Sequence, residues 1–335
     1  MRTCRAIVVA LGLLGIAAPP LYAQPKLEAV TMAVPAYSLT FMEGYVADDL
    51  GLWAKHGLSV KSVLIPGIGS MNAVIGGSAD VAQVSAITLT RAAARGQKML
   101  EIAEPLDRLV VEAVLRKDLA EAAGFDPKAP LAKRALALKG RTIAVESINS
   151  IIHAYVRLLA RRAGLDPEAI RIAVMQPPNM IAAFAAKQID GFAMSLPWPL
   201  QPVLAGQAVT IASGPAGDPP EMVPFAHDVV VVRPDTCQKR PEICEGVGRS
   251  FAEAARFIKE QPDAALALMQ KRFKTLDPPL LRAAFDEVRS VSPSPPAPTE
   301  KALENADLYN IDAGLMKPDE KLRSYADLFT DKYVK

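Results

Sequence analysis

The sequence predicts a two-lobed α/β protein in which two parallel-rich sheets, each flanked by helices, are joined by a two-strand hinge. The first observation is that strand-like and helix-like segments alternate in two separate blocks, a pattern typical of parallel sheets covered by helices. The second is a pair of apolar runs, residues 109–115 and 228–232, that would carry the chain out of the first lobe and back into it. The third is length, because the residues after position 23 are numerous enough for two cores of ordinary domain size.

The first block contains three strand-like runs, at residues 30–34, 58–65 and 81–84. A helix is predicted over 71–76 with Ser70 as its N-cap, because serine is favoured at helix starts and the following glycines at helix ends. The third run ends at Ser85. This block forms the sheet of the first lobe.

The second block repeats this plan, with strands predicted over 142–145, 171–175 and 191–194. Helices follow the loops at 146–150 and 176–179. Beyond residue 232 the pattern is helical over 249–273 and 299–329, and the proline-rich segment 293–298 cannot continue a helix. We therefore assign residues 24–111 and 228–335 to lobe I, and 112–227 to lobe II.

The first 23 residues have the features of an export signal. Arg2 and Arg5 precede an apolar run over 6–18, and the small residue Ala23 stands where cleavage is expected. The run is shorter than the roughly 20 apolar residues that span a bilayer. We therefore expect cleavage near Ala23 and a soluble, monomeric protein in the periplasm.

Charge argues against two classes of partner. Without residues 1–23 the chain carries 36 basic and 36 acidic side chains, with no basic cluster. Nucleic acids require a concentrated positive face, and so does electrostatic attachment to a membrane. We predict neither partner.

Cysteine usage agrees with export. Only Cys237 and Cys244 follow the leader, and a short polar segment separates them. An oxidising compartment favours their pairing. We predict a disulfide between them, with two unrelated buried thiols as the alternative.

The residue types that catalysis requires are not grouped in this sequence. His56, His153 and His227 are far apart and do not have metal-binding spacing. The sequence also lacks a nucleophile elbow, a glycine-rich phosphate loop and paired catalytic acids. We therefore predict no catalytic residues, no metal site, no cofactor and no enzymatic activity.

Five short segments resemble a known family, the nitrate/sulfonate/taurine-type solute-binding proteins, whose relatives include proteins similar to thiamine-pyrimidine synthesis proteins. The segments occur in the family's order and spacing: DLGLWAKHGLSV at 49–60, GSADVA at 77–82, LKGRTIAV at 138–145, AGLD at 163–166 and QIDG at 188–191. The resemblance implies a type II periplasmic-binding fold with a small-molecule ligand between the lobes. It also implies a role in an ABC importer, with a permease and its ATPase as partners.

Physical reasoning predicts the same place for the ligand, because ligands of open α/β sheets bind at the carboxyl ends of strands, beside helix N-termini. The candidate ligand-binding residues lie in five loops and one apolar cover: Tyr37, Ser38, Gly69, Ser70, Ser85, Thr88, Glu146, Ser147, Asn149, Pro177 and Trp198. Their polar groups would hydrogen-bond a solute, while aromatic rings would cover its apolar part. The alternative for Ser38, Ser70 and Ser147 is that each only caps a helix.

The charge of the ligand stays open. None of the five loops contains Arg or Lys, whereas Glu146 lies in one of them and Glu112 and Asp228 lie on the crossing runs. Either these carboxylates face solvent or the ligand also carries a polar nitrogen. The expected solute is a small organic molecule of the sulfonate, carboxylate or N-heterocycle class.

Two other functions use the same fold. One is an enzyme similar to the thiamine-pyrimidine synthesis proteins, which by that resemblance would need iron and a cluster of metal ligands. The other is a solute-binding sensor or adaptor, because lobe closure alone creates a new surface that a partner can recognise.

Overall fold

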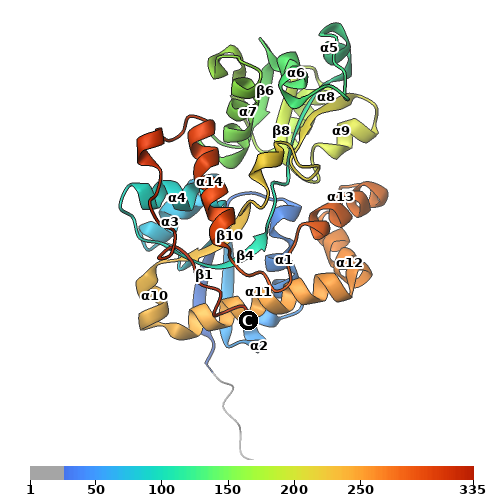
Figure 1. Ribbon diagram of the computed structural model, residues 1–335. Helices are drawn as coiled ribbons and strands as arrows, with labels where there is room; N and C mark the ends of the chain where they lie inside the picture. Colours follow the sequence, from blue (N-terminus) through green and yellow to red (C-terminus); the bar gives the residue numbers. More distant parts are fainter. Residues whose placement is uncertain (1–25) are drawn as a thin grey trace, which may run out of the picture.

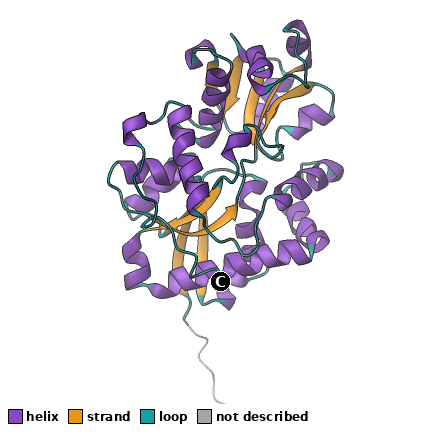
Figure 2. Cartoon of the chain, viewed as in Figure 1, coloured by secondary structure: helices purple, strands orange, loops and turns teal. Residues whose placement is uncertain are grey.

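The computed structural model describes residues 26–335, so the predicted leader and its cleavage near Ala23 lie outside the described residues (Figure 1). Two five-stranded sheets organise this part of the chain. Figure 2 shows strands in the middle of each lobe and helices on the outside. Within residues 26–335, no helix is both long and apolar enough to cross a membrane.

The first sheet has the strand order β2-β1-β3-β10-β4. Its strands are β1 (Glu28–Val34), β2 (Leu58–Leu64), β3 (Val81–Val84), β4 (Leu100–Leu106) and β10 (Asp228–Val232). β1 pairs in parallel with β2 and β3, and β10 runs antiparallel to β3 and β4. The start of β10 therefore lies beside the carboxyl end of β3, where ligands of such sheets bind.

Most helices of lobe I cover this sheet. They are η1 (Leu39–Phe41), α1 (Met42–Asp49), α2 (Leu52–Lys55), α3 (Gly69–Ile75), α4 (Ala86–Ala94), α10 (Pro234–Lys239), α11 (Pro241–Glu260), α12 (Pro262–Arg272), α13 (Pro278–Ser290), α14 (Glu300–Asp312) and η5 (Pro318–Glu320). In α11 the buried residues Val247, Phe251, Ala254 and Ile258 recur every three or four positions, which gives one apolar face. That face packs against α1, α2 and the sheet.

The second sheet has the order β7-β6-β8-β5-β9. Its strands are β5 (Val111–Arg116), β6 (Thr142–Val145), β7 (Arg171–Val174), β8 (Gly191–Ser195) and β9 (Ala208–Ser213). Its helices are α5 (Lys117–Ala122), α6 (Leu131–Ala135), η2 (Leu136–Leu138), α7 (Ile151–Arg162), η3 (Pro167–Ala169), α8 (Pro177–Ala185), α9 (Leu200–Leu204) and η4 (Pro220–Met222). Together the two sheets confirm the predicted two-lobed α/β class.

The two connections between the sheets lie side by side. The Phe225 amide donates to Asp107 O at 2.7 Å, and the His227 amide donates to Leu106 O at 3.1 Å. These bonds join the segment that leaves β4 to the segment that enters β10. The predicted lobe boundaries, 24–111 with 228–335 and 112–227, stay a prediction.

Several elements differ from the predictions. The pattern does not predict β4, β9 or α13; in β4 two glutamates and a proline interrupt the apolar residues. The predicted helix over 299–329 is wrong beyond Asp312, because Gly314 adopts a φ of 71° and Pro318 follows it. The segment 293–298 is a loop, as predicted, and Pro296 O accepts a hydrogen bond from β4.

The predicted disulfide is present. Cys237 of α10 and Cys244 of α11 are bonded, with their Cα atoms 5.5 Å apart. The bond fixes the sharp turn between the two helices.

Replacing both cysteines with serine is expected to lower the free energy of unfolding by about 2 kcal/mol, because a loop this short restricts the unfolded chain only modestly. Chemical denaturation of the oxidised protein, the reduced protein and the double variant measures the difference. The reduced protein should match the variant, and identical midpoints for all three would contradict a stabilising role.

Candidate ligand-binding site between the lobes

The lobes contact each other through backbone and side-chain groups next to β1 and β8. Leu196 O accepts hydrogen bonds from Ser38 Oγ at 2.9 Å and from the Leu39 amide at 3.2 Å. The indole Nε1 of Trp198 donates to Tyr37 O at 3.0 Å. Two of the predicted ligand residues, Ser38 and Trp198, therefore hold the lobes together in this closed arrangement.

A second contact joins the loops after β2 and β6. A Cβ atom at Gly67 would lie 2.3 Å from Ser147 Oγ, so only glycine fits between the loops without movement. Close by, Arg91 Nη2 donates to Asn149 O at 2.7 Å. Asn149 has a φ of 60°, which asparagine tolerates better than most residues. The predicted loop residues Ser147 and Asn149 thus contact lobe I.

α14 makes a third contact between the lobes. Tyr309 OH donates to Ile151 O at 3.2 Å, and Arg162 of α7 pairs with Asp312 at 2.8 Å. Figure 1 shows α14 beside α4 with one end toward α7. These contacts join the lobes along one side of the boundary between them, which is called the seam below.

The three serines differ in whether they cap a helix. Ser38 caps η1, because its Oγ accepts from the Thr40 amide at 3.1 Å. Ser147 does not cap α7; that position belongs to Ser150, whose Oγ accepts from the His153 amide at 3.2 Å. The predicted N-cap role of Ser70 is wrong, because α3 begins one residue earlier and Ser70 Oγ donates back to Ile65 O at 2.7 Å.

The other predicted residues take varied positions. Tyr37 is partly exposed, stacks on Phe273 with ring centroids 4.5 Å apart, and donates its hydroxyl to Arg272 O. Thr88 Oγ1 donates to Ser85 O at 2.7 Å, across the first turn of α4. Gly69 is the first residue of α3, and Pro177 is the buried first residue of α8. Tyr37 therefore packs mainly on lobe I.

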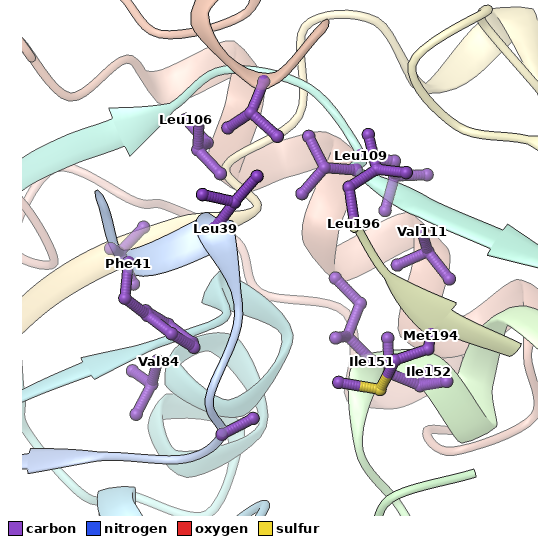
Figure 3. Packing of buried hydrophobic residues seen from close by; sticks show 14 of the residues in the cluster. Leu39, Phe41, Val84, Leu106, Leu109, Val111, Ile151, Ile152, Met194 and Leu196 are labelled. Carbon is purple, nitrogen blue, oxygen red and sulfur yellow. The ribbon is translucent and has the colours of Figure 1, made fainter. Parts of the chain in front are cut away.

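The interior between the lobes is apolar. Figure 3 shows Leu39, Phe41 and Val84 on the lobe I side, facing side chains of lobe II that include Met194 and Ile151. All of them are buried. A solute held here would meet an apolar wall.

Buried polar atoms without hydrogen-bond partners in the described residues occur at the strand ends next to this interior. They are Ser85 Oγ after β3, Glu112 Oε2 in β5, Glu146 Oε2 after β6, and His227 Nδ1 and Asp228 Oδ1 at the start of β10. Native proteins satisfy most buried polar groups, so each such atom needs an explanation. Both lobes contribute to the set, as a ligand shared between lobes requires.

The carboxyl groups in this set do not face solvent. The exposed fractions of Glu112, Glu146 and Asp228 are 4%, 6% and 0%, so the solvent-facing alternative is wrong. Burial raises the pKa of Glu112 and Glu146 to about 7 and that of Asp228 well above its usual range. Protonated carboxyls can donate as well as accept hydrogen bonds.

The histidine beside them is neutral. Burial lowers the pKa of His227 to about 3, so its ring carries no charge at physiological pH. A neutral imidazole with a free Nδ1 can hydrogen-bond an uncharged group of a ligand.

The sequence patterns do not predict Arg91 as a contact between the lobes. The five candidate loops contain no Arg or Lys, but Arg91 lies on α4 one helical turn beyond the predicted residue Thr88. Residues three apart share a helix face, and this spacing is the signal that could identify it. Thr88, Arg91 and Asn149 line one pocket of about 290 Å³ at the edge of the seam.

Two α/β lobes, joined by two crossings and closed over buried polar groups, define the type II periplasmic-binding architecture. The sequence model of the NMT1-like family matches residues 23–271. The chain therefore belongs to the NMT1-like family.

Relatives and solved structures agree with this assignment. One relative is a Brachyspira hyodysenteriae protein whose name describes it as an ABC transporter periplasmic binding protein. It is 24% identical over 292 residues, which cover 83% of this chain and 75% of the relative's length. A Bordetella bronchiseptica structure superposes with a TM-score of 0.81 at 17% identity, covering 92% of this chain and 96% of its own.

Two further structures carry the names of their ligands. The alkanesulfonate-binding protein of Xanthomonas axonopodis pv. citri, bound to MOPS, has a TM-score of 0.69 at 18% identity and coverages of 92% and 99%. The nitrate-binding protein of Synechocystis has a TM-score of 0.67 at 13% identity and coverages of 93% and 88%. At these identities the likeness establishes the shared fold.

Proposed function

We propose that this protein is the periplasmic solute-binding component of an ABC importer, and that it holds a small organic solute between its lobes. The observation that carries the proposal is the set of buried polar atoms, contributed by both lobes, that have no hydrogen-bond partner within residues 26–335. A solute placed there would satisfy Ser85, Glu112, Glu146 and His227, and would lie against the apolar wall.

Contacts to both lobes are what make such a site functional. A solute that touched one lobe only would have no differential affinity for the closed state and could not shift the hinge. The closed protein would then present one continuous surface to the permease, whose ATPase drives import. The solute would leave chemically unchanged, which separates this role from that of an enzyme.

The names of the relatives support this proposal and suggest where to begin with solutes. One is named for ABC transport and two for binding sulfonate or nitrate. The buried carboxyls of this chain also suit solutes that donate hydrogen bonds. Sulfonates, carboxylates and N-heterocycles are therefore the three classes of solute expected to bind.

A thermal-shift screen of residues 24–335 tests the proposal, because a solute that binds only the folded state raises the melting temperature. Calorimetric titration of each hit should give one solute per chain, and mass spectrometry should recover it unchanged. Chemical conversion of the solute by the protein would count against a transport role, as would a screen of these three classes without a hit.

Ser147→Ala and Ser150→Ala form a matched pair of variants in one loop. Loss of Ser147 Oγ is expected to weaken solute binding roughly tenfold with little change in the melting temperature of the empty protein. Loss of the α7 cap at Ser150 is expected to cost about 1 kcal/mol of stability with or without solute. Titration and melting of both variants measure these effects. Unchanged affinity in Ser147→Ala would remove that residue from the site.

A further inference from the structure

A groove between α3 and α4 forms a second pocket-like feature, apart from the interior of the seam. It has a volume of about 290 Å³ and is lined by Ile68, Met71, Asn72, Ile75, Thr88, Arg91, Ala92, Arg95, Gln97 and Asn149. Asn149 alone comes from lobe II. Figure 1 shows α3 and α4 side by side, below α7.

The lining of this groove combines apolar and positively charged side chains. Met71, Ile75 and Ala92 give it an apolar surface, while Arg91 lies in the last turn of α4 and Arg95 is the C-cap residue of that helix. Among residues 26–335, no carboxylate lines the groove. A pocket with two guanidinium groups and no acid has a positive potential that favours an anion.

Arg91 is the unusual member of this set. Its exposed fraction is 8%, yet its side chain forms no ion pair within residues 26–335, and the hydrogen bond found there is the one to Asn149 O. Burial and the neighbouring Arg95 lower its pKa to about 10, so it remains charged at physiological pH. A buried charge without a counter-charge is costly unless a further group compensates it.

We propose that this groove binds a small organic oxyanion, with its charged head on Arg91 and Arg95 and its aliphatic part against Met71 and Ile75. A guanidinium presents several N–H groups in one plane, so Arg91 can hold Asn149 O and an oxyanion at once. Asn149 of lobe II lines the same groove, so an anion that also contacts Asn149 stabilises the closed arrangement. Thr88 and Asn149 line this groove and are also predicted solute residues, but Ser85, Glu112, Glu146 and His227, which carry the proposed function, do not line it, so the anion site does not depend on that proposal.

Hexanoate serves as the probe, with hexylammonium and hexanol as matched ligands of opposite and zero charge. Calorimetric titration of residues 24–335, without solute, should detect hexanoate and neither of the other two. Arg91→Gln is expected to weaken hexanoate at least tenfold, and Arg95→Gln roughly threefold or more, because each removes a charged hydrogen-bond donor. Arg282→Gln, on the exposed face of α13, should bind as the wild type does.

Arg95→Gln leaves the bond between Arg91 and Asn149 in place, so it tests the groove even if Arg91→Gln disturbs the fold. Ser147→Ala separates the two sites, because it should keep the hexanoate response. Equal binding of hexylammonium, or full hexanoate affinity in Arg95→Gln, would overturn the proposal. Loss of hexanoate binding in Ser147→Ala alone would place the anion between the lobes and overturn it as well.

Discussion

Gly67→Asn is expected to weaken solute binding by roughly 10- to 100-fold. Gly67 has a φ of 56°, which asparagine tolerates, but its new side chain would meet Ser147 across the seam. Overpacking of this kind costs about 1 to 3 kcal/mol, and here the cost falls on the closed state alone. The apparent dissociation constant rises as the closed fraction falls. Titration with the solute found in the screen measures this change.

Gly51→Asn is the matched control. Gly51 has a φ of 67°, and a Cβ atom there would have no neighbour within 4 Å. This variant should bind solute as the wild type does. Adding Ser147→Gly to Gly67→Asn removes both atoms that collide, so the double variant should bind solute with the affinity of Ser147→Gly alone. Wild-type affinity in Gly67→Asn would mean that the two loops separate in the solute-bound protein.

The sequence predicts the framework of this protein well because alternation and turn residues are local signals. β1, β2, β3, β6 and β8 stand where the apolar runs indicate. β4 is harder to predict, because Glu101 and Glu104 are buried within it and polar residues ordinarily mark exposed positions. Their burial depends on the C-terminal segment that covers them, which includes Thr299 and Leu328.

The candidate site is only partly predictable for a related reason. The loops follow from the rule that ligands bind at strand ends, and Ser38, Ser147 and Asn149 do lie where the lobes meet. Whether a hydroxyl caps a helix depends on the residue at which the helix begins. α3 begins one residue before Ser70, and Ser150, not Ser147, caps α7. The contact between Arg91 and Asn149 joins residues 58 positions apart and requires the assembled lobes.

The free energy of unfolding is expected to fall as the pH rises from about 4.5 to about 8. Glu43 lies in the first turn of α1, is 0% exposed, and neither carboxyl oxygen has a partner in the described residues. Burial raises its pKa to about 8, and burial also raises the pKa of Glu104 to about 8. Both carboxyls are therefore protonated in the folded protein and ionised in the unfolded chain across this range.

The sign follows from proton uptake on folding. Where the folded state binds more protons than the unfolded state, stability decreases with pH. Below the ordinary carboxyl pKa both states are protonated and the contribution is fully present, and it is lost once the pH exceeds the raised pKa. For Glu43, the free energy of unfolding changes by roughly 3 to 5 kcal/mol over this pH range. This is an upper value, because water that reaches the ionised carboxylate reduces the change.

Glu43→Gln isolates this contribution, because glutamine has nearly the same shape and stays neutral at every pH. The variant should resemble the wild type at pH 4.5 and exceed its stability at pH 8.5 by about 2 kcal/mol or more, since no ionisation then opposes folding. Urea denaturation at a series of pH values measures both curves. Glu245→Gln on the exposed face of α11 should keep the wild-type slope. If Glu43→Gln keeps that slope too, the Glu43 carboxyl is ionised or hydrated in the folded protein and does not cause the pH dependence.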